Sequence, residues 1–158
     1  MFFAAAAHCV VAQSPPSGAS NPEKKRRLNI YHHLGSVEVP DGFTGYVGAN
    51  WNDAWAGSID APSGGISIDW RAGLIEYVVE KRKKDVISQE VDRTAGFPID
   101  FSRLRDTRGN TLVAKIGWLE FSSLVRTEKE EATFLAIVRS FQKEKCLTCR
   151  SLPFKIQE

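Results

Sequence analysis

The sequence predicts an α+β domain, in which an antiparallel meandering β-sheet is covered by a C-terminal amphipathic helix. The first observation is a strongly specified helix at residues 127–141. The second is a series of short apolar stretches before it, several of which alternate between apolar and polar residues, as half-buried strands do. The third is the Gly and Pro punctuation between these stretches, which is typical of turns joining neighbouring strands.

The helix is predicted by its first turn and by its apolar face. Thr127 and Glu130 have the spacing of a capping box. Acidic residues in this turn are stabilised by the positive end of the helix dipole. Apolar residues then recur at i, i+3, i+4 and i+7, at Phe134, Ile137, Val138 and Phe141. We expect this stripe to be buried against the sheet, with Trp70 or Phe101 among its neighbours.

The strands are expected between turn sequences such as Pro40-Asp41-Gly42, and a Gly-containing loop at residues 61–65 indicates a β-hairpin. Residues 74–79 fit either a strand or a helical turn, and their β-branched content favours extended structure. The charged run 80–85 should face water. The expected strands cover residues 37–39, 43–47, 54–60, 66–70, 86–91, 97–101, 111–116 and 118–125.

Composition bounds the class of protein. With 158 residues, of which 42% are hydrophobic and 25% charged, the chain suits one globular domain at residues 31–142 with tails. The net charge of only +2 argues against a nucleic-acid partner. The basic runs 24–27 and 81–84 leave a basic surface module as a weaker alternative to solvated surface.

The N-terminal segment resembles a secretory signal. Residues 2–12 are apolar apart from His8, are too short to span a bilayer, and end in Val10-Val11-Ala12, which suits cleavage before Gln13. No Lys or Arg precedes the run, so a hydrophobic N-terminus of a cytosolic protein is the alternative. We expect a signal peptide at 1–12, export to the periplasm or extracellular space, and a disordered polar and basic linker at 13–30.

The C-terminal tail at residues 143–158 carries a Cys-x-x-Cys pair, Cys146 and Cys149. The pair follows a helix, whose C-terminal end does not stabilise a thiolate as a helix N-terminus would. A zinc site would need two further ligands, and the sequence holds no second Cys pair and no His-x₃-His motif. A structural disulfide is therefore favoured in an exported chain, and thiol-redox chemistry is the alternative.

A second candidate site is the Trp-rich stretch with Trp51, Asp53 and Trp55, which could stack on and hydrogen-bond to a flat ligand. The alternative is that these residues supply core and a turn. The sequence has no phosphate-binding Gly-rich loop, no nucleophile elbow and no His-Glu-x-x-His motif. The carboxylates Asp53, Asp60, Asp69 and Glu76 could include an acid–base pair, but their spacing picks out no two that must converge. We therefore expect no catalytic residues, no metal site and no cofactor.

The order of three segments resembles the layout of PsbP-like domains and of small exported bacterial proteins of unknown function. These segments are Val-Pro-Asp-Gly-Phe at 39–43, the glycine hairpin at 57–65 and Phe-Leu-Ala-Ile-Val-Arg-Ser-Phe at 134–141. The resemblance implies an antiparallel sheet with packed helices and a binding role. The resulting hypothesis is an exported, non-catalytic domain that binds a protein or envelope partner or has a structural role; the alternative is a thiol-redox protein.

Overall fold

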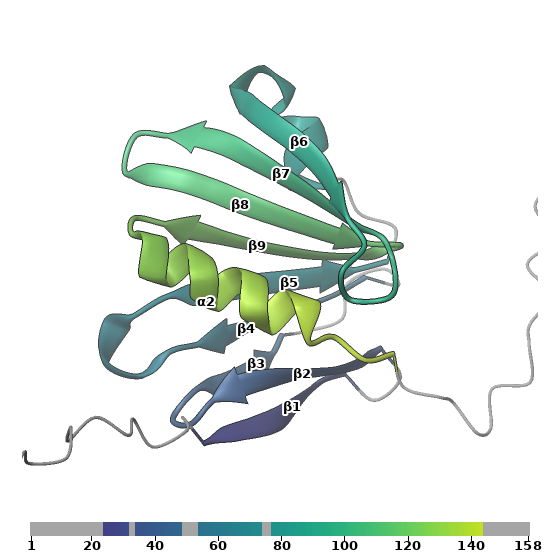
Figure 1. Ribbon diagram of the computed structural model, residues 1–158, viewed down its shortest axis with the longest axis vertical. Helices are drawn as coiled ribbons and strands as arrows, with labels where there is room; N and C mark the ends of the chain where they lie inside the picture. Colours follow the sequence, from purple (N-terminus) through teal and green to yellow (C-terminus); the bar gives the residue numbers. More distant parts are fainter. Residues whose placement is uncertain (1–23, 32–33, 49–53, 74–76, 144–158) are drawn as a thin grey trace, which may run out of the picture.

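The computed structural model describes residues 24–31, 34–48, 54–73 and 77–143. One long helix, α2 (Glu128–Arg139), lies in front of a broad sheet, and a separate hairpin lies below (Figure 1). The strands are β1 (Lys25–Tyr31), β2 (Gly35–Pro40), β3 (Thr44–Val47), β4 (Trp55–Asp60), β5 (Ser67–Ala72), β6 (Val86–Asp92), β7 (Ile99–Asp106), β8 (Gly109–Ile116) and β9 (Leu119–Val125), and the short helices are η1 (Pro62–Gly64), α1 (Val78–Lys81) and η2 (Lys83–Asp85). The predicted α+β class is confirmed.

The sheet is formed by two meanders that meet in its middle. The strand order is β3-β4-β5-β9-β8-β7-β6, and every neighbouring pair is antiparallel. Strands β3 to β5 follow one another along the chain, as do β6 to β9, and the pairing of β5 with β9 joins the two groups. In this join Trp70 lies opposite Phe121. Strands β1 and β2 pair only with each other as a two-stranded sheet.

The expected hairpin at residues 54–70 is confirmed as β4 and β5. Its turn needs a left-handed backbone at Ser63 (φ 58°) and Gly64 (φ 71°), a region that glycine enters without strain. Asp60 stabilises the end of the hairpin next to the turn, because its carboxylate accepts hydrogen bonds from the hydroxyls of Ser58 (2.7 Å) and Ser67 (2.5 Å).

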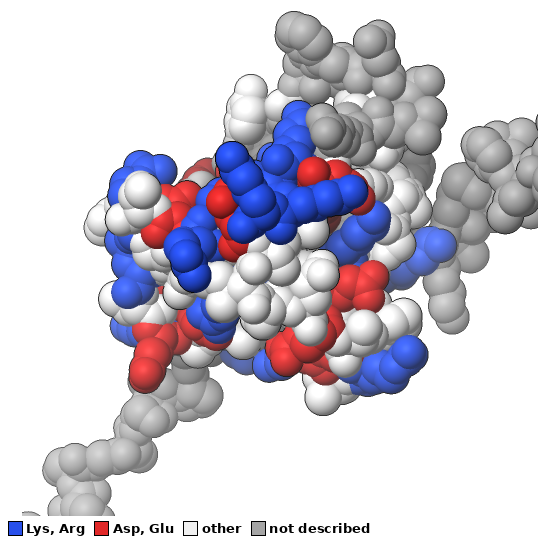
Figure 2. Space-filling view, turned by 90° about the horizontal axis from the view of Figure 1, so that it is seen from above, with Lys and Arg blue, Asp and Glu red and all other residues white. Residues whose placement is uncertain are grey.

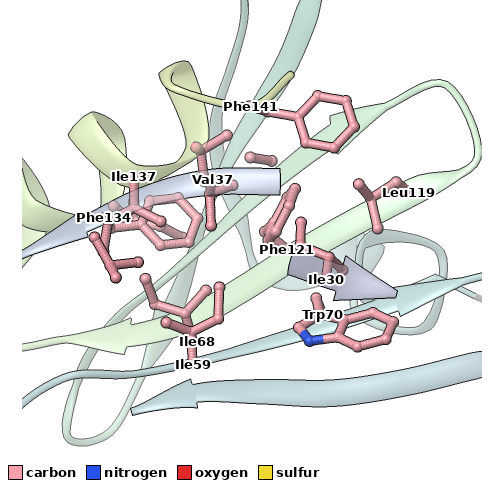
Figure 3. Close-up of a cluster of buried hydrophobic side chains, with 14 of the residues drawn as sticks. Ile30, Val37, Ile59, Ile68, Trp70, Leu119, Phe121, Phe134, Ile137 and Phe141 are labelled. Carbon is pink, nitrogen blue, oxygen red and sulfur yellow. The ribbon is translucent and has the colours of Figure 1, made fainter. Parts of the chain in front are cut away.

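Helix α2 covers one face of the sheet and encloses the core together with the β1–β2 hairpin. The predicted apolar stripe is buried, and Phe141 is the most exposed of its four residues at only 8%. Phe141 meets Phe97 and Phe121 edge to face, with ring centroids 6.1 and 6.3 Å apart. Trp70 and Phe101 belong to the same buried cluster, as expected. Figure 3 shows Trp70 in this cluster, together with Phe134 and Ile137 of α2.

The start of α2 differs in one detail from the predicted capping box. The Thr127 hydroxyl accepts the backbone N–H of Glu130 at 3.2 Å, as predicted. The Glu130 carboxylate instead accepts the backbone N–H of Arg126 at 2.6 Å, one residue before the cap. Both side chains still satisfy backbone donors at the start of the helix.

The end of α2 closes the free edge of β2. Ser36 and Gln142 exchange two backbone hydrogen bonds of 2.9 and 2.8 Å, and the backbone N–H of Glu38 donates to the Ser140 hydroxyl at 2.7 Å. Gly35 is required next to this bridge, because a Cβ there would collide with the backbone of Gln142 and the ring of Phe141. The first hairpin of the domain is therefore joined to its last helix.

Two expectations were wrong. The predicted linker at 13–30 ends too late, because Lys25–Tyr31 forms β1: Leu28 and Ile30 alternate with polar residues and pack into the core. The basic run hid this alternation. Extended structure was expected up to residue 79, but Val78 begins α1, in which the Glu80 carboxylate accepts the backbone N–H of Tyr77 at 2.8 Å. Residues 74–76 lie outside the described residues.

Truncation of the helix stripe should destabilise the domain. Phe134→Ala removes a ring that is fully buried between helix and sheet, so we expect a loss of about 3–5 kcal/mol in the free energy of unfolding. Urea unfolding followed by circular dichroism measures it. The exposed Lys129→Ala on the same helix is the control; a loss at Phe134 below about 1 kcal/mol would contradict burial of the stripe.

Candidate functional site

The face of the sheet opposite α2 carries a row of charged residues of alternating sign. Asp100 of β7 lies opposite Lys115 of β8, Lys115 lies opposite Glu120 of β9, and Glu120 lies opposite Arg71 of β5. Because directly opposite residues in a sheet share a face, these four side chains project to the same side. We call this side the charged face. The segment containing α1 and η2 is anchored on it.

Glu120 is the centre of this row and is the one carboxylate of the described residues with almost no exposure, at 1%. The backbone N–H of Val78 donates to both of its oxygens, at 3.2 and 3.1 Å, and Arg71 Nε lies 3.5 Å away. Burial raises the pKa of Glu120 above its usual value, and the hydrogen bond from Val78 and the charge of Arg71 oppose this rise only in part. The buried carboxylate thus attaches the start of α1 to β9.

Lys115 fixes the same segment from the other side. Its Nζ lies 3.9 Å from the centroid of the Tyr77 ring and 3.8 Å from a carboxylate oxygen of Glu80. The Tyr77 hydroxyl donates to the carbonyl of Trp118 at 3.2 Å. Burial, followed by the negative charges of Glu120 and Glu80, raises the pKa of Tyr77, so its hydroxyl keeps its proton.

A cleft of about 370 Å³ opens between α1 and strands β6 to β8. Its lining is unevenly charged, with four acidic residues against one lysine. Gln89 and Ser102 hydrogen-bond to each other at 3.1 Å across β6 and β7 beside it. The cleft is lined by Tyr77, Val79, Glu80, Gln89, Glu90, Val91, Asp100, Phe101, Ser102, Val113, Lys115 and Glu120.

Arg82, in the basic run at 81–84, forms ion pairs with acidic side chains. Arg82 pairs with Asp85 at 3.0 Å and with Asp106 at 3.4 Å, and it donates to the Thr111 hydroxyl at 3.2 Å and to the carbonyl of Arg105. Figure 2, which looks down on the top of Figure 1, shows red acidic side chains among the blue basic ones rather than a uniformly basic surface. Arg82 therefore holds η2 to the sheet, and this does not favour the basic-module alternative.

Of the residues predicted from the sequence as site residues, Trp55 alone lies within the described residues. Trp51 and Asp53, like Cys146 and Cys149, lie outside the described residues. Trp55 is in β4, partly buried and packed against the core, which fits the alternative of a structural tryptophan.

Of the carboxylates considered in the sequence, Asp60 and Asp69 do come close. Burial is the largest cause that raises the pKa of Asp69, Arg71 lowers it, and the negative charge of Asp60 raises it further. Because Asp60 accepts two serine hydroxyls in the hairpin, Asp60 has a structural role that its position in the sequence did not reveal.

The charged row was missed at the sequence level. Its signal is the period-2 pattern of the predicted strands, which puts Lys115 on the same face as Val113, and Glu120 on the same face as Ser122. Sequence alone could not pair these strands with the Arg71 strand, which lies far away along the chain.

Two further findings concern metals and membranes. Within the described ranges, no three His, Cys, Asp or Glu side chains are grouped so that they could hold a metal ion. No helix in the described part of the chain is long and apolar enough to cross a membrane.

A search of protein-family models, curated proteins and solved structures found no match to this chain. The resemblance to PsbP-like domains therefore stays a prediction.

The role of the Glu120 charge can be tested by two substitutions. Glu120→Gln keeps a hydrogen-bond acceptor for the backbone N–H of Val78, so we expect a free energy of unfolding within about 1 kcal/mol of wild type at pH 7. Glu120→Ala leaves Val78 without its acceptor and Arg71 without its ion-pair partner, and should lower the free energy of unfolding by about 1–3 kcal/mol. Because the folded protein holds the Glu120 proton more tightly than the unfolded chain, this group makes stability fall as pH rises through its folded pKa.

Thermal unfolding of wild type and Glu120→Gln across pH 4 to 8 measures this contribution, and the difference between the two curves isolates it. A glutamine variant as unstable as the alanine variant would show instead that the charge itself is needed.

Proposed function

We propose that this protein is an exported, non-catalytic binding domain whose cleft on the charged face receives a cationic group of a protein or envelope partner. The observation that carries the proposal is the lining of this cleft, in which the acidic residues on the side of the charged face, Glu80, Asp100 and Glu120, outnumber Lys115. A guanidinium or ammonium group is the chemistry that such a lining favours.

The dimensions and walls of the cleft support binding. Its volume of about 370 Å³ lies in the range of pockets that hold small ligands or single side chains. Val79, Val91 and Val113 supply apolar wall for the aliphatic stem of a long basic side chain. The positive charge of Lys115 repels a bound cation only weakly, because the Glu80 carboxylate lies beside its amine. Asp100 is exposed and is free to meet a ligand at the mouth.

The chemistry of the charged face supports binding rather than catalysis. The two carboxylate oxygens of Glu120 are already occupied, because they accept the backbone N–H of Val78 and pair with Arg71. Two of the three buried serines of the described residues are also engaged structurally: Ser102 accepts from Gln89, and Ser123 donates to the carbonyl of Ser67 at 2.6 Å. A nucleophile would need a base within hydrogen-bond reach, and these two hydroxyls have none as partner.

The cellular part of the proposal rests on the sequence. The uncharged apolar run at 2–12 and its Val-Val-Ala end favour export through a cleaved signal. In an oxidising compartment Cys146 and Cys149 would close a short structural disulfide. An exported binding domain would meet its partner in the envelope or outside the cell.

The cleft can be tested with single-residue probes. We expect N-acetyl-arginine amide to shift the amide NMR signals of Gln89 and Lys115, and N-acetyl-glutamate amide not to do so, because the lining is acidic. Asp100→Asn should weaken the arginine probe about tenfold, since it removes one charge-assisted contact. Glu128→Gln, an acidic residue on α2 away from the cleft lining, is the matched control.

Absence of shifts with the arginine probe, or equal shifts with both probes, would contradict a cation-binding cleft. A loss of binding in Glu128→Gln as large as in Asp100→Asn would show that only the overall charge matters.

Export can be tested separately by N-terminal sequencing of the protein from its native host. We expect a mature chain that begins near Gln13, because the segment before it has the small residues that signal cleavage requires. Recovery of residues 2–12 intact on the folded protein would reject cleavage and export by this route.

A further inference from the structure

The cleft on the charged face already holds a cation that belongs to the protein itself. Lys115 of β8 lines this cleft, and its amine lies 3.9 Å from the centroid of the Tyr77 ring and 3.8 Å from Glu80 Oε1. A position over the face of an aromatic ring and beside a carboxylate is favourable for a cation. The ring face of Tyr77 and Oε1 of Glu80 therefore form a cation-binding position, which we call the Tyr77 subsite.

The Tyr77 subsite is held in place by contacts that do not involve the amine. The Tyr77 hydroxyl donates to the carbonyl of Trp118 at 3.2 Å, and the backbone N–H of Tyr77 donates to Glu80 Oε2 at 2.8 Å. The backbone N–H of the next residue, Val78, donates to the buried carboxylate of Glu120. These hydrogen bonds position the ring and leave the other oxygen of Glu80, Oε1, for the cation. The subsite therefore keeps its shape when the amine leaves.

The Lys115 amine is held more loosely than the subsite around it. Its distance of 3.8 Å from Glu80 exceeds hydrogen-bond length, and it makes no hydrogen bond to any other residue that the structure describes. The side chain is 35% exposed, so the amine can turn into water without becoming a buried, unpaired charge. An amine that is held in this way can be exchanged for a cation that fits the subsite better.

We propose that a guanidinium group of the ligand displaces the Lys115 amine from the Tyr77 subsite, so that this lysine is an internal competitor of the ligand. The inference rests on the proposed cation-binding cleft and names the group that the cleft selects, an arginine side chain rather than a lysine. A planar guanidinium stacks on the ring face, is more weakly hydrated than an ammonium, and still donates to Glu80 Oε1. A lysine of the ligand would only replace one ammonium by another.

The competition determines how tightly the cleft binds. The amine is tethered to a strand that lines the cleft, so it competes at a constant effective concentration. A subsite that is open for only about a tenth of the time binds about tenfold more weakly than one that is always open. Because Glu80 offsets the charge of the amine, occupancy of the ring face rather than charge repulsion is the main obstacle to the ligand.

Displacement can be observed directly in the wild-type protein. In the free protein the end of the Lys115 side chain lies over the face of the Tyr77 ring, so the ring current should shift the NMR signals of its ε-CH₂ protons upfield. We expect N-acetyl-arginine amide to return these signals to ordinary lysine positions, and Nα-acetyl-lysine amide to bind about fivefold more weakly. Lysine signals that stay in place while the amide of Gln89 shifts would overturn the displacement and leave the proposed function standing.

Two substitutions of Lys115 separate competition from charge repulsion. Lys115→Met removes the amine and keeps an apolar stem, so we expect the arginine probe to bind about five- to tenfold more tightly. Lys115→Arg keeps the charge and places a guanidinium beside the ring. Binding should then weaken at least about threefold, whereas repulsion alone would leave it unchanged. Lys84→Met removes an exposed lysine outside the cleft lining and is the control that should bind as wild type does.

Isothermal titration calorimetry measures these affinities, circular dichroism checks that each variant is folded, and the NMR measurement on wild type depends on neither variant. Wild-type affinity in both Lys115 variants, or equal tightening in Lys84→Met, would overturn the competition. A probe that binds neither wild type nor Lys115→Met would overturn this inference and the proposed function together. Binding to Lys115→Met alone would support the competition and contradict the proposed function of the wild-type cleft.

Discussion

The pairing of β5 with β9 is the constraint on which the rest of the structure depends. Each of the two meanders folds from neighbouring strands, but only this pairing makes them one sheet. It places Trp70 beside Phe121, and the apolar surface that results is wide enough to be covered by α2 and the first hairpin together. Without it, neither meander would offer the helix a complete surface to bury.

The pairing of β5 with β9 also makes one face of the sheet apolar and the other face charged. Alternation along β5 and β9 puts Trp70 and Phe121 toward the helix, and Arg71 and Glu120 toward the other side. A buried carboxylate is costly, and its value lies in directing one backbone N–H, that of Val78, to one place. The charged face is thus a consequence of the apolar core, since both arise from one strand register.

Much of the fold could be predicted because it is encoded locally. The helix cap at Thr127, the glycine turn at 61–65 and the alternation of Ile99 and Phe101 with polar residues in β7 are all signals within a few residues. Two local patterns led to wrong predictions. The basic run was interpreted as linker although the residues after it alternate and form β1, and the β-branched residues before residue 80 were interpreted as extended although Tyr77 caps α1.

The site could not be predicted, because it depends on which distant strands become neighbours. No spacing in the sequence relates Arg71 to Glu120, and a side chain's environment follows only when the strand order is known. The carboxylates Asp60 and Asp69 show the same limit, since their proximity comes from the hairpin register and not from their separation along the chain.

The bridge between Ser36 and Gln142 has a consequence for the order of assembly. The first hairpin has no strand partner in the main sheet, and its β2 edge is closed by residues that are synthesised after all the described strands. Contacts of such long sequence separation form late and slowly. The N-terminal hairpin must therefore wait for the end of α2 before it docks, and a growing chain stays open until nearly the whole domain has been synthesised.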